Sequence, residues 1–138
     1  MILTRAFKSV IRSRQSSSLS DIPTYHRLAD HLLDHLHDSI DASIDTHPQA
    51  DSFDTSLSMG VLTVKLASFG TFVVNKQPPN LQIWLSSPIS GPSRFDFGGQ
   101  RGEWVYRREG KELVSLLSQE LSVLLKQPIT LSVPKLYK

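Results

Sequence analysis

The feature that most constrains the fold is a series of short strand-like segments joined by turns of only a few residues. These segments alternate polar and apolar residues, the pattern of a strand with one buried face. They span residues 52–58, 61–67, 71–75, 82–86, 94–97 and 103–107. The joins contain turn residues such as Met59-Gly60 and the corner Pro78-Pro79-Asn80. Links this short favour hairpins, so we expect an antiparallel sheet.

Two amphipathic helices flank these strands. Apolar residues recur every three or four positions from Pro23 to Asp45 and again from Glu109 to Lys126. The order helix, hairpins, helix predicts the α+β class: a two-layer αβ sandwich with the N- and C-terminal helices on one face of a largely antiparallel sheet of about five to seven strands. The tail from Ile129 to Tyr137 either adds a short strand or lies across the core.

Composition narrows the function classes. The chain has 138 residues, of which 39% are hydrophobic, enough for one domain with a modest core. No apolar run reaches the roughly 18 residues of a membrane span, so we expect no membrane insertion. Because the chain contains no cysteine, it has no thiolate nucleophile, and we expect no iron–sulfur cluster bound by its own residues.

The first 20 residues differ from the rest in charge. They contain Arg5, Lys8, Arg12 and Arg14, several serines and no acidic residue. This composition predicts a mitochondrial transit peptide; a disordered or nucleic-acid-binding basic arm is the alternative. Residues 21–138 are then the folded domain.

Residues 75 to 92 combine the polar corner Asn-Lys-Gln-Pro-Pro-Asn with the strand Gln-Ile-Trp-Leu-Ser and a closing Gly-Pro. This string resembles the signature of the frataxin family, and the resemblance extends over roughly residues 25 to 125. It implies the same αβ sandwich and a place in the mitochondrial matrix. It also implies iron binding and docking on the complex of cysteine desulfurase and iron–sulfur scaffold protein, where frataxins promote sulfur transfer and cluster assembly.

The first helix carries a row of aspartates. Asp30, Asp34, Asp38, Asp41 and Asp45 fall within an arc of roughly 80° on an ideal helix. They form either a solvated polar face or a row of hard oxygen ligands that would hold a cation weakly and exchangeably. The frataxin resemblance implies iron, Fe²⁺ or Fe³⁺, bound along an acidic ridge; the residues that match it are Asp30, Asp34, Asp38, Asp41, Asp45, Asp51 and Asp54.

Histidines accompany these aspartates. His31 stands where frataxins usually have an acid, and His35 follows one turn later on the same helix face. Two imidazoles beside carboxylates suit divalent transition metals, so we include both residues in the predicted metal site. Incidental surface histidines are the alternative.

The second candidate site is the face of the sheet that the helices leave uncovered. In frataxins the residues that match Asn75, Lys76, Gln77, Trp84 and Arg94 contact the assembly complex, and we expect the same partner surface here. The alternative places Trp84 in the core. Two departures from the family pattern, Leu81 in place of a lysine and Phe97 in place of a frequent tryptophan, lie beside this surface.

The sequence therefore predicts a mitochondrial iron-binding protein that assists iron–sulfur cluster assembly. A ferroxidase that oxidises Fe(II) with O2 and stores the product is the rival from the enzyme class, and a generic acidic docking module is a third possibility. No histidine outside the first 47 residues could pair with a serine nucleophile, and no glycine spacing suits a phosphate loop. We expect no nucleic-acid partner, and a monomer, with iron-dependent oligomers as the alternative.

Overall fold

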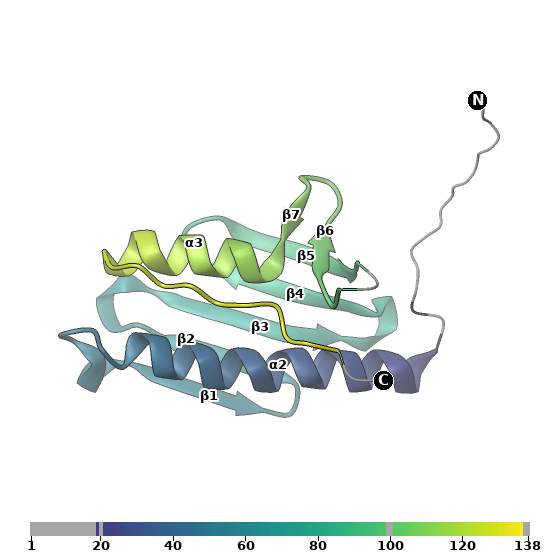
Figure 1. The fold of residues 1–138 in the computed structure, drawn as a ribbon, viewed down its shortest axis with the longest axis horizontal. Coiled ribbons are helices and arrows are strands. Elements are labelled where there is room, and N and C mark those ends of the chain that lie inside the picture. The colour runs from purple at the N-terminus through teal and green to yellow at the C-terminus, as the bar shows by residue number, and fades with distance from the viewer. Residues whose placement is uncertain (1–18, 20, 99–100, 137–138) are drawn as a thin grey trace.

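The chain forms two layers, a seven-stranded sheet with both helices on one of its faces (Figure 1). The computed structural model describes residues 19, 21–98 and 101–136, so the predicted transit peptide lies, apart from Leu19, outside the described residues. All neighbouring strands are antiparallel and follow one another in sequence order. They are β1 (Asp54–Ser58), β2 (Val61–Lys65), β3 (Thr71–Gln77), β4 (Gln82–Ser87), β5 (Gly91–Phe97), β6 (Trp104–Tyr106) and β7 (Lys111–Glu112). The predicted α+β sandwich is confirmed.

Helix α2 (Ile22–Ile44) covers the β1 side of the sheet. It begins where the carboxylate of Asp21 accepts hydrogen bonds from the backbone N–H and the hydroxyl of Thr24, both at 3.0 Å. Such a cap satisfies one of the backbone donors left free in the first turn of a helix. The apolar stripe that predicted this helix is buried against the sheet; its members are Tyr25, Ala29, Leu32, Leu33, Leu36, Ile40 and Ile44.

Strand alternation divides the sheet into a covered and an uncovered face. The side chains of Leu62, Val74 and Phe95 point toward the helices and are fully buried. Their neighbours along each strand point the other way, as the period of two requires; we call that side the outer face. Trp104 is 1% exposed and lies in the core, in edge contact with Tyr25 and Phe97.

Helix α3 (Leu113–Leu125) begins four residues later than its apolar spacing predicts. The start at Glu109 is wrong because Gly110 turns the chain with a φ of +65° and the next two residues pair as β7. The carboxylate of Glu112 then accepts the N–H groups of Val114 and Ser115, each at 2.9 Å, and so fixes the first turn. Neither described helix is long and apolar enough to cross a membrane.

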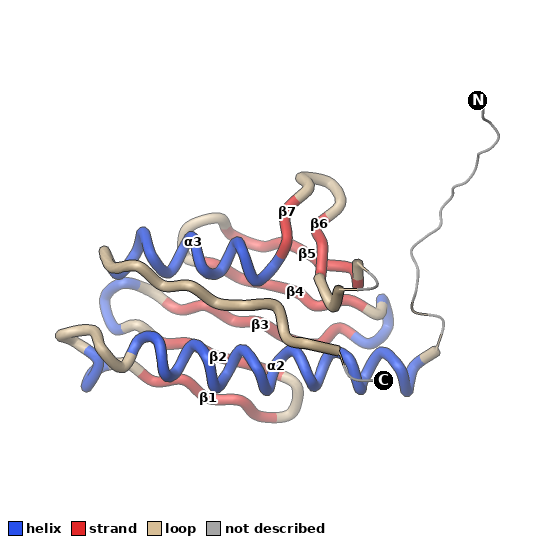
Figure 2. Tube along the Cα trace, viewed as in Figure 1, coloured by secondary structure: helices blue, strands red, loops and turns tan. Residues whose placement is uncertain are grey.

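The C-terminal tail, residues 129–136, runs between α2 and α3 and forms no strand (Figure 2). Side chains of α3 accept the backbone hydrogen bonds of the tail that a neighbouring strand would otherwise accept. The hydroxyl of Ser122 accepts the N–H of Ile129 at 2.9 Å, and that of Ser118 accepts the N–H of Leu131 at 2.9 Å. Of the two predicted positions for the tail, the structure adopts the one across the core.

Candidate functional site

The predicted metal-binding aspartates form one exposed band. Asp30, Asp34, Asp38, Asp41 and Asp45 lie on the face of α2 opposite its buried stripe, and all five are exposed. The band continues through Asp51 in the short helix η2 (Ala50–Ser52) to Asp54, the first residue of β1, and both are exposed. We call these seven residues the acidic ridge.

Most of the ridge carboxylates form no ion pair with the described residues. Asp30 accepts a hydrogen bond from the Lys76 ammonium at 2.7 Å, and Asp38 lies 3.2 Å from Nδ1 of His37. The other five carboxylates make no hydrogen bond or ion pair within the described part of the chain; they are Asp34, Asp41, Asp45, Asp51 and Asp54.

The ridge does not close around a common point. Among the described residues, no three side chains of His, Cys, Asp or Glu come together as the ligands of one metal ion. A cation on this surface would therefore be held by one or two carboxylates and keep several of its water molecules.

The two predicted histidine ligands point away from the ridge. Nε2 of His31 lies 2.8 Å from the carbonyl oxygen of Lys135, and Nε2 of His35 lies 2.7 Å from that of Ser132. Because a carbonyl oxygen can only accept, each Nε2 carries the hydrogen in these bonds. Both imidazoles thus hold the tail against α2, a role that the spacing within the helix does not reveal.

Four of the five predicted partner residues lie on the outer face. The register places Asn75 opposite Trp84, and Trp84 opposite Arg94, so the three form a row across β3, β4 and β5. Gln77 is two residues beyond Asn75 on the same side of β3. Trp84 is half-buried, in contrast to the core residue Trp104.

Lys76 has the opposite orientation. It shares the parity of Phe72 and Val74, which face the helices. Its ammonium group reaches α2 and pairs with Asp30, and its side chain is only 15% exposed. Lys76 therefore connects the sheet to the ridge and does not belong to the row of the outer face.

A chain of hydrogen bonds fixes the orientation of Trp84. Its indole N–H donates to Oε1 of Gln82 at 2.9 Å, and the Gln82 amide donates to Asp96 at 3.1 Å. The other oxygen of Asp96 lies 3.7 Å from Nε of Arg107. The sequence analysis did not single out Asp96; its alternation with buried neighbours in β5 was the available signal. Beside these contacts, a shallow cavity of about 410 Å³ includes Asn75, Trp84 and Arg94 in its lining.

Tyr25 connects helix α2, which carries most of the ridge, to strands β3 and β4, which carry part of the outer face. Its hydroxyl donates to the carbonyl of Gln82 at 2.7 Å and accepts the N–H of Gln77 at 2.9 Å. These two residues flank the short helix η4 (Pro78–Asn80), the proline corner of the sequence. Burial raises the pKa of Tyr25 to about 12, with the N–H of Gln77 acting in the opposite direction and the charge of Asp30 adding a smaller increase. A residue of α2 thus holds the corner from which the Trp84 strand begins.

With this geometry in place, comparison with known proteins decides the family. The sequence profile of the frataxin-like domain matches residues 18–127. The chain is 45% identical to mitochondrial frataxin of Arabidopsis thaliana over 132 residues, which cover 95% of this chain and 70% of the plant protein. The chain belongs to the frataxin family.

Other frataxins agree in sequence and in fold. Mitochondrial frataxin of Caenorhabditis elegans is 43% identical over 91% of this chain and 92% of its own length. A crystal structure of trimeric frataxin from Saccharomyces cerevisiae, complexed with ferrous iron, superimposes with a TM-score of 0.64 at 45% identity and covers 80% of this chain and 94% of the yeast chain. Within this frataxin, the histidine pair bound to the tail is the feature that the family resemblance did not imply.

Proposed function

We propose that this frataxin is an iron-handling accessory protein of iron–sulfur cluster assembly in the mitochondrial matrix. It docks on the complex of cysteine desulfurase and scaffold protein through its outer face, and it promotes sulfur transfer there. Fe(II) binds along the acidic ridge as cargo. The observation that carries the proposal is the row Asn75, Trp84 and Arg94, which lies uncovered on the outer face.

The row has the chemistry of a protein interface. Aromatic residues and arginine are enriched at such surfaces, and a few of them supply most of the binding free energy. The contacts through Gln82 and Asp96 hold the Trp84 indole in one orientation. Less side-chain entropy is then lost when a partner covers it.

The ridge supports the iron-handling part of the proposal. Five of its carboxylates form no ion pair in the described chain; neighbouring carboxylates repel one another, and a bound cation relieves that repulsion. Ligands that do not converge favour weak and exchangeable binding, which suits delivery. The yeast relative complexed with ferrous iron supports the choice of metal.

The remaining predictions concern location, assembly state and the rival activity. The basic first 20 residues and the relatives named mitochondrial support the matrix location. We propose a monomer; iron-dependent oligomers are the alternative, which the trimeric yeast relative supports. No observation in the described residues favours a ferroxidase. Oxygen consumption per Fe(II) added to the purified protein tests that alternative.

The deciding experiment replaces Trp84 by Ala and measures desulfurase activation together with Fe(II) affinity under anaerobic conditions. Loss of the indole should weaken docking by about 2 kcal/mol or more, as at an interface hot spot. Activation should therefore collapse while Fe(II) affinity stays at the wild-type value, because the ridge lies on α2 and β1.

Trp104→Ala is the control, since truncation of this core residue should cost the fold about 3–5 kcal/mol. Wild-type activation by Trp84→Ala, or a melting penalty as large as that of Trp104→Ala, would remove the outer face as the docking surface.

A further inference from the structure

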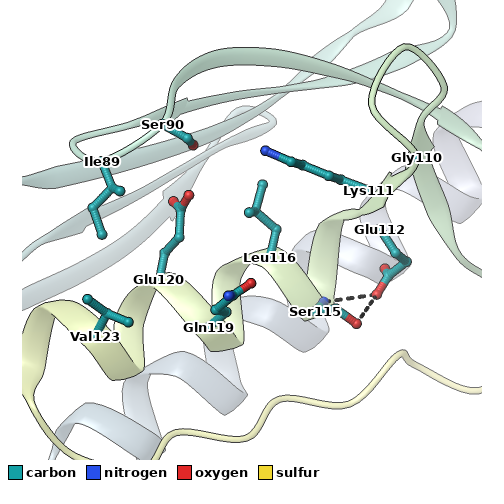
Figure 3. Close-up of a pocket in the computed structure, with 10 residues that line it drawn as sticks. All are labelled: Ile89, Ser90, Gly110, Lys111, Glu112, Ser115, Leu116, Gln119, Glu120 and Val123. Carbon is teal, nitrogen blue, oxygen red and sulfur yellow. Dashed lines mark hydrogen bonds between the residues drawn. The ribbon is translucent and has the colours of Figure 1, made fainter.

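A cavity lies on the far side of α3 from the tail, and none of its lining residues belongs to the acidic ridge or to the row of the outer face. Its walls come from α3, from the β4–β5 turn and from residues 110–112 (Figure 3). It has a volume of about 730 Å³, which falls in the range of about 300 to 1,000 Å³ of small-molecule sites.

The buried residue Glu120 supplies a carboxylate to this cavity. Its side chain is 6% exposed, and its Oε1 accepts the hydroxyl hydrogen of Ser87 at 2.6 Å. The Ser87 oxygen in turn accepts the N–H groups of Ile89 and Ser90 at 3.0 and 3.1 Å, so these contacts tie the turn to α3. Oε2 of Glu120 accepts no hydrogen bond from the described part of the chain. In Figure 3 the carboxylate points from α3 toward the turn that carries Ser90.

The other charged groups of the cavity are already engaged. Lys111 donates to Glu109 at 2.9 Å, and this hydrogen bond is the main cause of its raised pKa, ahead of the charge of Glu120. Glu112 accepts two N–H groups at the start of α3. The charge of Glu120 therefore has no ion-pair partner within the described residues.

The cavity lining combines this carboxylate and the Lys111 side chain with three apolar side chains. Leu116 is 8% exposed, Ile89 48% and Val123 67%, so the apolar surface widens toward solvent. A buried carboxylate with one unused oxygen is a strong acceptor in a site partly shielded from water. It repels anions and attracts cations, and an ammonium group can donate to the oxygen that Ser87 leaves unused.

We propose that this cavity binds a primary ammonium group carried on an apolar stem. The ammonium donates to Oε2 of Glu120, and the stem lies against Ile89, Leu116 and Val123. A free alkylamine and a lysine side chain of another protein present this same chemistry. The proposal is independent of iron binding and of docking on the outer face.

The test is a titration of the full chain with small-molecule probes. The NMR signals of its Ile, Leu and Val methyl groups report binding. The probes are 4-methylpentylamine, its neutral isostere 4-methylpentan-1-ol, and lysine blocked at both ends as Nα-acetyl-lysine N-methylamide. The amine should shift the methyl signals of Ile89, Leu116 and Val123 saturably, with an affinity at least tenfold above that of the alcohol. Binding of the blocked lysine as well assigns the cavity to a partner's lysine, and binding of the alkylamine alone assigns it to a small amine.

Substitutions locate the site. Glu120→Gln retains an acceptor for Ser87 but removes the charge, so amine affinity should fall at least tenfold. Lys111→Met removes a repelling charge, so affinity should rise. Glu103→Gln, which makes the same change of side chain outside the cavity lining, is the matched control and should leave the amine affinity unchanged.

Equal binding of amine and alcohol, no binding of either ammonium probe, or shifts that survive Glu120→Gln would overturn the proposal. If Glu120→Gln fails to fold, the comparison of amine with alcohol on the unmodified chain decides alone.

Discussion

At the scale of single residues, the hydroxyl of Tyr25 connects α2 to two strands of the sheet. This hydroxyl satisfies a backbone donor and a backbone acceptor on either side of the proline corner. The side chain is completely buried. Because burial disfavours the tyrosinate, the phenol keeps its hydrogen over the whole physiological pH range.

Tyr25→Phe should lower the free energy of unfolding at pH 7 by about 1 to 3 kcal/mol, since the N–H of Gln77 and the carbonyl of Gln82 lose their partner. The pH dependence gives a second readout. The folded-state pKa of about 12 lies above the ordinary value of 10.0, so the contribution of Tyr25 is complete below pH 10 and is lost as the pH rises toward 12. The loss amounts to about 2 to 3 kcal/mol.

Denaturation of both proteins at pH 7, 10 and 11 checks this expectation. The stability difference between wild type and Tyr25→Phe should narrow above pH 10. A constant difference across the three pH values would show that the Tyr25 hydroxyl does not titrate with folding.

The sequence does not predict the contacts of a side chain whose hydrogen-bond or ion-pair partner is distant in the chain. The spacing of His31 and His35 correctly placed both on one helix face, but the carbonyls that they bind are 104 and 97 residues away. Lys76 was grouped with its sequence neighbours, whereas strand alternation turns it toward Asp30. Helical and strand periodicity indicate the direction of a side chain but not its partner.

At the scale of elements, the aspartates of α2 should raise Fe(II) affinity and slightly lower the stability of the fold. Changing Asp34 and Asp38 together to Asn removes two neighbouring charges one helical turn apart. Fe(II) affinity should fall clearly. The free energy of unfolding should stay level or rise by a few tenths of a kcal/mol, because like-charge repulsion at i, i+4 is relieved.

Anaerobic calorimetry with Fe(II) and a thermal melt measure the two effects. The charge-matched control is Glu103→Gln with Glu109→Gln, which leaves α2 unchanged. A ridge with a purely structural role would show the reverse result, a lower melting temperature and unchanged iron binding.

The tail depends on two serines of α3. Replacing Ser118 and Ser122 by Ala leaves the N–H groups of Leu131 and Ile129 without their acceptors. We expect a loss of about 1 to 3 kcal/mol for each and earlier proteolysis of the tail. Ser86→Ala with Ser90→Ala is the control, since both side chains are exposed. Wild-type denaturation of the α3 double variant would mean that apolar contacts alone hold the tail.

Element boundaries were predictable where the signal is local. The apolar stripe predicted α2 to within one residue at each end. The start of α3 was not predictable in the same way, because Lys111 and Glu112 fit the helical spacing but pair with β6. The tail was left open, since its hydrogen-bond partners are side chains of another element.

At the scale of the whole molecule, the order of elements predicted the sandwich. The positions of the acidic ridge and of the outer face could be predicted because both lie on faces that the core leaves exposed. The strand register was the missing information. Without it, the contact between Gln82 and Asp96 could not be predicted from two strands considered separately. The same holds for the cavity beside Glu120, which needs the β4–β5 turn and the β6–β7 segment at once.

The sequential strand order has a kinetic consequence. Every strand pairs with its neighbour in sequence, so hairpins close through short loops and at small entropic cost. A chain that is delivered gradually from its N-terminus can therefore build the sheet one hairpin at a time. The tail is the exception: its bonds to α2 span about a hundred residues, and it can be seated only after the last segment has arrived. We expect the docking of residues 129–136 between α2 and α3 to be the final step of folding, so that a chain cut short or stalled would hold a formed sheet and two helices without the tail between them.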